Sequence, residues 1–350
     1  FLVASILTCR ALAIGTSAAS AVLIEQNSGR ILYQQNADEE RLIASITKIM
    51  TAVVALEHAD KGCSYTVTAR DMAEGSSMYL KPGDTLLLEE LLYGLMLASG
   101  NDAALAVAHC VSGETEDFVA LMNETARRLG MTHTHFANPN GLDAEGHYSS
   151  ARDMAVLAAY ALKNQDFRRI VSTASVTIGE RYLANHNKLL RLYGGCIGVK
   201  TGFTKAAGRT LVSAAAREGM TLVCATLNDG DDWNDHMALL DYGFANYHME
   251  TAVPAGRVLA SVLVQGGTAV SIPLAASEEL RYPLTGEESL KVVARVPLSI
   301  PAPVVPGQAV GEVCAYLEDQ EVARVDLVAA APSAKKERVP APSSWWDKAF

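Results

Sequence analysis

The spacing of apolar residues in the first two thirds of the chain predicts helices packed on an antiparallel sheet. Two short β-prone runs, 22–24 and 31–33, are separated by the turn residues Asn27-Ser28-Gly29, so a hairpin is expected there. From 45 to 58 the apolar residues recur every three or four positions, which indicates a helix. Further helices are expected at 89–97, 102–110, 152–162 and 235–247, and adjacent strands at 198–203, 210–215 and 221–227. The predicted fold class is α+β, with one antiparallel sheet flanked by helices.

Near Pro254 the pattern changes and the helical spacing disappears. Short valine-rich runs punctuated by glycine and proline take its place, which is typical of a small β-sandwich of about 80 residues. These runs are 257–264, 269–273, 291–296, 309–316 and 321–328. We therefore expect an α+β domain at 20–253 and a β-rich domain at 254–330. The stretch that follows, 331–344, is rich in proline, serine and lysine and has the composition of a linker.

Both ends of the sequence carry apolar segments. Residues 1–19 are apolar and small and resemble the end of a signal peptide cleaved near Ala18 or Ala19; a buried N-terminal helix is the alternative. At the other end, 345–350 contains two tryptophans and a phenylalanine, which indicates either the start of a membrane-associated helix or a tail folded on the β domain. We expect an exported protein with a peripheral membrane contact through its C-terminus.

Composition and charge exclude several classes of protein. Apolar residues make up 49% and charged residues 19%, as in a folded globular protein. The net charge of −10 argues against binding to nucleic acid. The six cysteines show no metal-ligand spacing, and most are expected to be buried; the sequence does not identify a disulfide pair. No metal or cofactor is expected.

The first chemical signal is Ser45-Ile46-Thr47-Lys48, at the start of a predicted helix. Side chains three residues apart project from the same helix face and can form a hydrogen bond. Lys48 can act as general base toward the Ser45 hydroxyl only as a neutral amine, which requires burial or a second cation nearby. Free N–H groups at the helix start can stabilise an oxyanion. Taken alone, the pattern is weak, because Ser333 and Lys336 have the same spacing.

Two further motifs make coincidence improbable. Ser99-Gly100-Asn101 opens a predicted helix, and Lys200-Thr201-Gly202 lies in a predicted strand. Separately they read as an ordinary helix cap and an ordinary edge strand. In the order Ser-x-x-Lys, Ser-x-Asn, Lys-Thr-Gly they form the motif set of class A β-lactamases and penicillin-binding proteins.

The three motifs also have complementary chemical roles. Lys200 supplies the second cation that keeps Lys48 neutral, and with the Thr201 hydroxyl it attracts a substrate carboxylate. Ser99 relays a proton to the leaving amine, and Asn101 binds the substrate amide. Gly202 allows close approach of a substrate that lies along the strand as an additional β-partner.

On these motifs the chain resembles a low-molecular-mass penicillin-binding protein, a serine-type D-alanyl-D-alanine carboxypeptidase of the Gram-positive, spore-former-like branch. The stretches 75–80, 138–143, 185–190 and 203–209 resemble the same family. The resemblance implies a penicillin-binding transpeptidase fold followed by a β-rich domain. It also implies a location at the outer face of the cytoplasmic membrane and a peptidoglycan stem peptide ending in D-Ala-D-Ala as substrate.

The resemblance also assigns roles to further residues. Ser45 would be acylated by substrate or by β-lactam inhibitors, and the backbone N–H groups of Ser45 and Phe203 would form the oxyanion hole. Arg209 is a candidate for assisting with the carboxylate or, equally, a solvated strand residue. His147 is expected to have a structural hydrogen-bonding role, because Lys48 already serves as the base.

Three other functions share some of these motifs. A class A β-lactamase needs a deacylating glutamate, and no Glu-x-x-Leu-Asn stretch lies between Ser99 and Lys200. A non-catalytic penicillin-binding module would be expected to lack Ser45, Lys48 or Lys200, and all three are present. A D,D-endopeptidase acting on cross-linked peptidoglycan uses the same machinery, so the sequence leaves it open.

Overall fold

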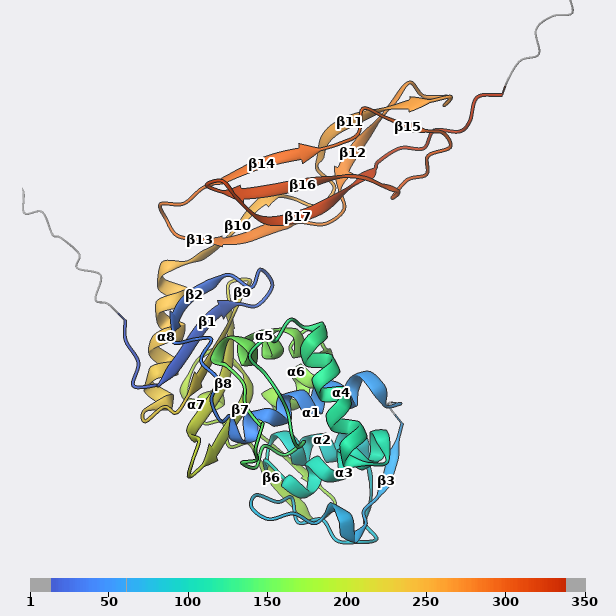
Figure 1. Ribbon diagram of the computed structural model, residues 1–350. Helices are drawn as coiled ribbons and strands as arrows, with labels where there is room; N and C mark the ends of the chain where they lie inside the picture. The colour runs from blue at the N-terminus through green and yellow to red at the C-terminus, as the bar shows by residue number, and fades with distance from the viewer. Residues whose placement is uncertain (1–13, 61, 338–350) are drawn as a thin grey trace, which may run out of the picture. The chain divides into compact units, whose positions relative to one another are not determined.

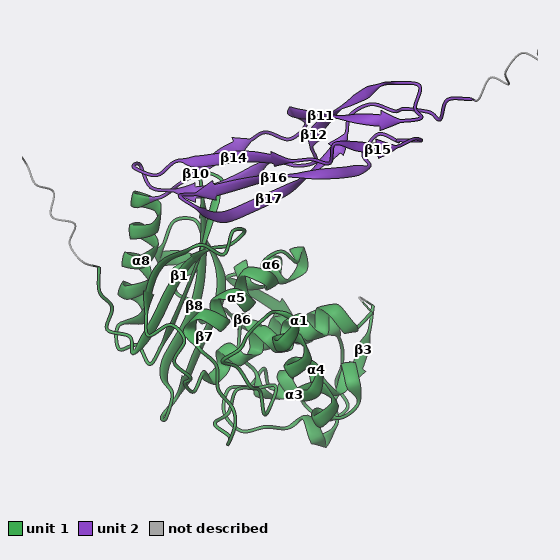
Figure 2. Ribbon diagram, turned by 45° about the horizontal axis from the view of Figure 1, so that its top comes forward, with its two compact units in different colours: residues 1–246 green, residues 247–350 purple. Residues whose placement is uncertain are grey.

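A computed structural model describes residues 14–60 and 62–337, and the chain divides into two compact units, Phe1–Asn246 and Tyr247–Phe350 (Figure 2). The boundary lies seven residues before the expected one at Pro254. The reason is that β10 (His248–Val253) pairs with β13 (Leu280–Leu284), far along the second unit. The local pattern of apolar and polar residues does not predict pairing between strands so far apart in the sequence.

The first unit is built on a five-stranded antiparallel sheet of order β2-β1-β9-β8-β7. Its strands are β1 (Ser20–Glu25), β2 (Ile31–Gln35), β7 (Cys196–Thr204), β8 (Gly208–Arg217) and β9 (Met220–Leu227). Every residue of β1 is buried, because α8 (Asp232–Asn246) covers one face of the sheet and α5 (Ala151–Ala161) the other (Figure 1). The predicted hairpin and the three adjacent strands are confirmed.

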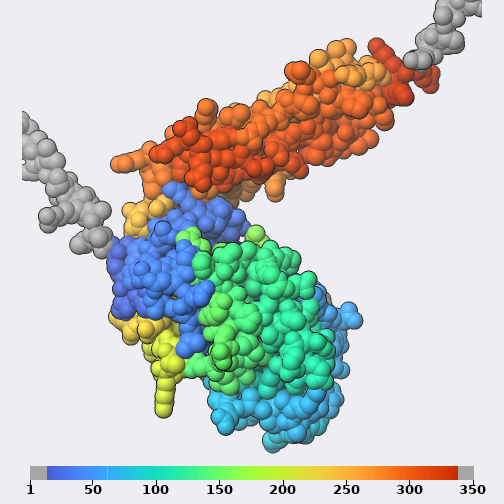
Figure 3. All heavy atoms as spheres, viewed as in Figure 1, coloured from blue at the N-terminus to red at the C-terminus, as the bar shows by residue number. Residues whose placement is uncertain are grey.

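The remaining helices of this unit share one apolar core with the sheet. Figure 3 shows their atoms packed closely on one face of the unit. Every predicted helix is present, with ends within a few residues of those expected. These other helices are η1 (Ala44–Thr47), α1 (Lys48–His58), η2 (Ala69–Asp71), α2 (Leu88–Met96), α3 (Asn101–Ser112), α4 (Thr115–Arg128), α6 (Gln165–Ser172) and α7 (Leu189–Leu192). Two short hairpins complete the unit, β3 (Ser64–Thr66) with β4 (Thr85–Leu87) and β5 (Ser175–Ile178) with β6 (Arg181–Ala184).

The second unit is all β, as expected. A six-stranded sheet of order β14-β16-β17-β12-β11-β15 shares one apolar core with the two-stranded β10–β13 sheet, since Val253 and Leu280 belong to the same buried cluster as Leu274 and Leu327. Its strands are β11 (Val258–Gln265), β12 (Ser271–Ala276), β14 (Leu290–Arg295), β15 (Ser299–Pro301), β16 (Ala309–Leu317) and β17 (Gln320–Ala329). All five predicted valine-rich runs are strands.

The expected linker begins later than predicted. Ser333 is buried and pairs with Val304, and its hydroxyl accepts a hydrogen bond from the backbone of Ala269 at 3.2 Å. The backbone N–H of Lys336 donates to Gly266 O at 2.8 Å. Residues 331–336 therefore belong to the β domain, and the Ser333–Lys336 spacing reflects a domain edge rather than a catalytic pair.

Several expectations fall at the ends of the sequence. Residues 1–13, most of the expected signal segment, and 338–350, with both terminal tryptophans, lie outside the described residues. In the part that is described, no helix is both long and apolar enough to cross a membrane.

The cysteines are less buried than expected. Cys224 and Cys314 are buried, whereas Cys63, Cys110 and Cys196 are only partly so. The thiol sulfur atoms of Cys63 and Cys110 lie 2.9 Å apart.

Candidate active site

Ser45 and Lys48 meet where a 3-10 turn passes into α1. The sequence predicts one continuous helix from residue 45, but residues 44–47 form the tighter η1 turn. Side chains three residues apart eclipse in a 3-10 turn, and the Lys48 Nζ lies 3.1 Å from the Ser45 Oγ. Ala44, directly before the serine, adopts a left-handed backbone with φ of 49°. This conformation is uncommon for a residue with a side chain and occurs preferentially at functional sites.

The Lys48 amine is completely enclosed. Besides Ser45, its Nζ contacts Asn101 Oδ1 at 2.7 Å and the backbone oxygen of Asn140 at 2.5 Å. All three contacts are to uncharged oxygen atoms. Burial lowers the pKa of Lys48 well below its ordinary value, and the charge of Lys200 lowers it further, while Asp102 acts in the opposite direction. Burial and the Lys200 charge therefore both favour the neutral amine that a general base requires.

Ser99 and Lys200 form the second pair of the site. The Lys200 Nζ donates to Ser99 Oγ at 3.0 Å and to the backbone oxygen of Thr201 at 2.8 Å. Ser99 also adopts a left-handed backbone, with φ of 58°, two residues before α3 begins at Asn101. Burial lowers the pKa of Lys200 to about 7. The Lys200 amine therefore changes between its protonated and its neutral form near neutral pH.

Asn101, the first residue of α3, links the two helices of the site. Its Oδ1 accepts from Lys48, and its Nδ2 donates to the backbone oxygen of Glu74 at 2.5 Å. A side-chain amide has two N–H groups. One donates to Glu74; the other makes no hydrogen bond to the described residues and can donate to a substrate carbonyl, the role that the sequence predicts for Asn101.

The Lys-Thr-Gly strand is β7, at the edge of the five-stranded sheet, where it pairs with β8 among the described strands. Gly202 has a role in packing besides the one expected toward substrate. A side chain there would collide with the hydroxyl of Thr210 and approach the backbone nitrogen of Ser45 to 2.9 Å. Glycine is therefore needed for the contact between β7 and the turn that carries Ser45.

An open pocket of about 500 Å³ lies in front of these groups. Ser45, Ser99, Thr201, Phe203 and Arg209 line it, together with Ser76, His186, Lys188, Gly202, Asp232 and Trp233. The Arg209 guanidinium makes a bidentate ion pair with the buried Asp232 carboxylate, at 2.7 and 2.9 Å, and lies over the Trp233 ring. Arg209 thus faces the pocket with its charge already partnered.

The structure brings the predicted residues together, and similarity to known proteins shows the family of the chain. A family model described as D-alanyl-D-alanine carboxypeptidase matches residues 8–231, and one described as the C-terminal domain of penicillin-binding protein 5 matches residues 247–333. The chain belongs to the D-alanyl-D-alanine carboxypeptidase family. This is a family of serine peptidases, and the predicted enzyme class is confirmed.

Relatives match along most of the chain. The D-alanyl-D-alanine carboxypeptidase DacF of Bacillus subtilis is 36% identical over 337 residues, which cover 91% of this chain and 86% of DacF. Penicillin-binding protein 5 of Haemophilus influenzae has a solved structure with a TM-score of 0.78, 28% identity and coverage of 92% and 98%. A D-alanyl-D-alanine carboxypeptidase structure from Mycobacterium tuberculosis has a TM-score of 0.64 and 36% identity, and covers 66% of this chain and 92% of its own.

The site of the carboxypeptidase also contains a buried residue that the sequence pattern did not single out. Asp102 is buried, and its carboxylate accepts hydrogen bonds from the Ser77 hydroxyl at 2.6 Å and from the backbone N–H groups of Met78 and Leu80, both at 3.0 Å. It thereby ties the loop beside the pocket to α3. An acidic residue directly after Ser-x-Asn was the available signal.

His147 has the expected structural role. Its Nε2 lies 2.8 Å from the Thr47 hydroxyl, and its Nδ1 accepts from the backbone N–H of Ala137 at 3.1 Å. Burial lowers the pKa of His147 to about 4, so the ring is neutral at physiological pH. Within residues 14–60 and 62–337, no three histidine, cysteine, aspartate or glutamate side chains are grouped so that they could hold a metal ion.

Proposed function

We propose that the enzyme is exported and removes the terminal D-alanine from the peptidoglycan pentapeptide at the outer face of the cytoplasmic membrane. The observation that carries the proposal is the buried Lys48 amine, 3.1 Å from the Ser45 hydroxyl and surrounded by uncharged oxygen atoms. A neutral amine at hydrogen-bond distance from a hydroxyl is the arrangement that a general base requires.

In the proposed reaction, Ser45 Oγ attacks the carbonyl carbon of the penultimate D-alanine while Lys48 takes the hydroxyl proton. The backbone N–H groups of Ser45 and Phe203 hold the oxyanion. The carbon–nitrogen bond then breaks, and the leaving amine receives the proton through Lys48 and Ser99. Water, activated by the same amine, hydrolyses the acyl-enzyme and releases the shortened peptide.

The substrate is held at three places. Lys200 and Thr201 bind the carboxylate of the terminal D-alanine, and the free N–H of Asn101 binds the acyl-side amide. The unpaired edge of β7 accepts the substrate backbone as an additional strand. Because Asp232 already neutralises Arg209, that guanidinium has a secondary role in attracting the carboxylate.

β-Lactams acylate the same serine in this proposal. The ring amide takes the place of the scissile amide, and the leaving amine stays attached to the acyl-enzyme. Since the sequence has no β-lactamase-type deacylating glutamate between Ser99 and Lys200, hydrolysis of this intermediate is slow. Rapid turnover of penicillin by the purified enzyme would contradict this assignment.

The test compares covalent labelling by a fluorescent penicillin in wild type, Ser45→Ala and Ser333→Ala. Ser333 is the serine of the other Ser-x-x-Lys pair and serves as the matched control. We expect labelling of wild type and of the control and none of Ser45→Ala. Equal labelling of all three proteins would contradict the assignment of Ser45 as the nucleophile. Absence of D-alanine release from a pentapeptide by an enzyme that does label would leave only a penicillin-binding module.

Export and peripheral membrane contact are the remaining parts of the proposal. They are supported by the apolar segment at 1–19, by the tryptophan-containing C-terminal segment and by a substrate that lies outside the cytoplasm. Fractionation of cells that produce the protein with its own N-terminus tests both. Recovery of active enzyme from the cytoplasm alone would contradict export.

A further inference from the structure

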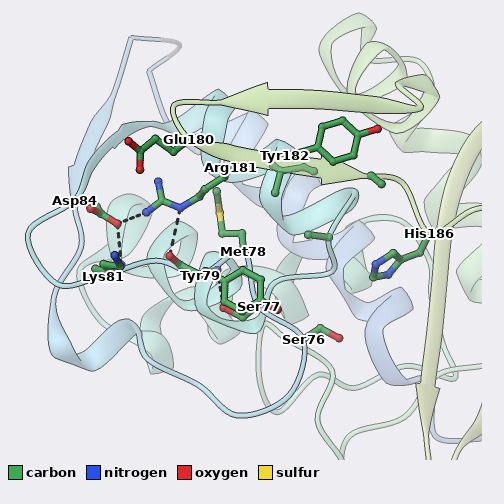
Figure 4. A pocket seen from close by; sticks show the side chains of 13 residues that line it. Ser76, Ser77, Met78, Tyr79, Lys81, Asp84, Glu180, Arg181, Tyr182 and His186 are labelled. Carbon is green, nitrogen blue, oxygen red and sulfur yellow. Dashed lines mark hydrogen bonds and ion pairs between the residues drawn. The ribbon is translucent and has the colours of Figure 1, made fainter.

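Two thiols meet beside helix α3, outside the pockets of the first unit. The Sγ atoms of Cys63 and Cys110 lie 2.9 Å apart, although 47 positions separate the two residues in the sequence. Neither cysteine lines the pocket in front of Ser45. Neither lines the adjoining pocket of about 850 Å³ between the loop at 76–81 and the β5–β6 hairpin (Figure 4). The thiol pair is therefore separate from the substrate site.

The backbone of each cysteine is held by its own element. Cys110 lies in the last turn of α3, a helix that packs against α2 and α4. Cys63 directly precedes β3, and its backbone N–H donates to the Asp60 carbonyl oxygen at 2.9 Å. The Cys63 carbonyl oxygen accepts from the backbone N–H of Leu88, also at 2.9 Å. The thiol contact therefore joins two positions that the fold already fixes.

A metal ion does not explain the pair. A tetrahedral zinc site needs four ligands, and two thiolates supply only half of them. No third histidine, cysteine, aspartate or glutamate joins the pair as a metal ligand among the described residues. Both ring nitrogens of the adjacent His109 are already engaged, one with Asp71 at 2.6 Å and the other with Thr115 at 3.0 Å. The two sulfur atoms need to approach by less than about 1 Å to reach disulfide bond length.

The two thiols differ in how they can react. Both cysteines are only partly buried, and Cys63 lies between the exposed residues Gly62 and Ser64. Burial, together with the contact to Cys63, raises the pKa of Cys110 to about 12. Because the thiolate is the attacking species, Cys110 is a poor first nucleophile. Cys63 is therefore the thiol that reacts first with an oxidant from solution.

We propose that Cys63 and Cys110 form a disulfide bond in the exported enzyme, by exchange with a disulfide oxidant outside the cytoplasm. The Cys63 thiol gives up its proton, and its sulfur bonds to one sulfur of the oxidant, whose other half leaves with that proton as a thiol. The Cys110 sulfur then loses its proton and bonds to the Cys63 sulfur, and the second half of the oxidant leaves as a thiol. Two protein thiols are oxidised to one disulfide, and one oxidant disulfide is reduced to two thiols.

The bond ties the last turn of α3 to the segment before β3. The same helix carries Asn101 at its start, two residues after Ser99. A cross-link between residues 47 positions apart restricts the unfolded chain and so stabilises the folded unit. We therefore expect a more heat-stable enzyme with an unchanged pocket. Only the oxidising location rests on the proposed function, because such bonds persist outside the cytoplasm; the thiol contact itself does not depend on it.

The test incubates the full chain, purified without reductant, with oxidised glutathione. Wild type is compared with Cys63→Ser and Cys110→Ser, and Cys196→Ser, another partly exposed cysteine of the first unit, is the matched control. Remaining thiols are alkylated in denaturant, and mass spectrometry of a digest detects peptides joined at residues 63 and 110. Thermal unfolding is measured with and without a phosphine reductant. Penicillin labelling checks that each variant is folded.

We expect joined peptides in wild type and in Cys196→Ser and none in the other two variants. The reductant should lower the unfolding temperature of wild type by about 5–10 °C and that of Cys63→Ser by less than about 2 °C. If a serine variant fails to fold, wild type with and without reductant decides alone.

Two results would overturn the inference. One is recovery of both wild-type thiols in free form, or of Cys63 carrying glutathione with Cys110 free. The other is a joined pair of peptides with no change in unfolding temperature, which would remove the stabilising role. Enzyme found only in the cytoplasm, reduced there but forming the bond with oxidised glutathione, would contradict export in the proposed function and not the pairing of the two cysteines.

Discussion

The Lys48 Nζ lies 2.7 Å from the Asn101 Oδ1, across 53 residues of sequence. This contact joins the start of α1 to the start of α3. It holds the Lys48 amine within hydrogen-bond distance of the Ser45 hydroxyl. The asparagine oxygen stabilises the amine hydrogens without supplying a negative charge. A carboxylate at this position would favour the protonated lysine and remove its capacity to accept a proton.

Replacing Lys48 by methionine should abolish the base while keeping a side chain of similar length. We expect the rate of acylation by a β-lactam to fall about 100- to 10,000-fold, the range of a general base. Stopped-flow or time-resolved penicillin labelling measures it. Lys205→Met, an exposed lysine after β7, is the matched control and should acylate normally. A Lys48→Met enzyme that acylates at the wild-type rate would rule out Lys48 as the base.

The pH dependence of stability should report on Lys200. Burial lowers its pKa in the folded enzyme from 10.5 to about 7, while the unfolded chain keeps the ordinary value. Between these two values the unfolded state binds more protons, so stability rises with pH. Relative to Lys200→Met, the wild-type free energy of unfolding should increase from pH 7 to 10 by at most about 1.4 kcal/mol per unit. Denaturant titrations at several pH values test this, and parallel curves for the two proteins would contradict it.

Asp102→Asn should loosen the loop beside the pocket. The carboxylate accepts from Ser77 and from the backbone of Met78 and Leu80, and an amide replaces one acceptor oxygen by a donor. We expect a loss of about 2–4 kcal/mol in unfolding free energy and slower acylation. Thermal unfolding and penicillin labelling measure the two effects. The exposed Asp117→Asn on α4 should change neither; a stable, fully active Asp102→Asn would show that the loop is held by other contacts.

Gly202→Ala should push strand β7 away from the turn that carries Ser45. The added methyl group would meet the Thr210 hydroxyl and the backbone nitrogen of Ser45, and both are fixed by their own elements. Overpacking of this kind costs typically about 1–3 kcal/mol. We expect strongly reduced acylation in a protein that still unfolds cooperatively. Gly194→Ala, where a methyl group meets nothing within 4 Å, is the control. Normal labelling of Gly202→Ala would contradict the assigned contact.

The sequence predicted the reacting side chains better than their environment. Ser45, Lys48, Ser99 and Lys200 were identifiable because each is a distinctive residue type at fixed spacing within its motif. The backbone oxygen of Asn140, which contacts Lys48, was not predictable, since every residue carries a carbonyl group. Only the tertiary fold brings that particular carbonyl, 92 residues away, to the amine.

The fold was predicted where one element carries its own signal. Helix α4 was overlooked although Phe118, Met122 and Ala126 repeat every four residues, so the pattern was present. Strand β10 was assigned to the wrong domain for a different reason. Most of its residues are at least partly exposed, and its partner β13 begins 27 residues after β10 ends. Pairing over that distance leaves no local periodicity.

The open edge of β7 has a consequence for handling the protein. Among the described strands β7 pairs only with β8, so the N–H and C=O groups on its other side can serve as a template for a strand from another copy. These backbone groups therefore have to remain accessible to the substrate peptide without pairing with a strand of another copy of the enzyme. In the proposed binding mode a covalently bound β-lactam lies along this edge, so we expect acylated protein to self-associate less than free enzyme at the same concentration. An inhibitor of catalysis is then expected to protect the enzyme against aggregation.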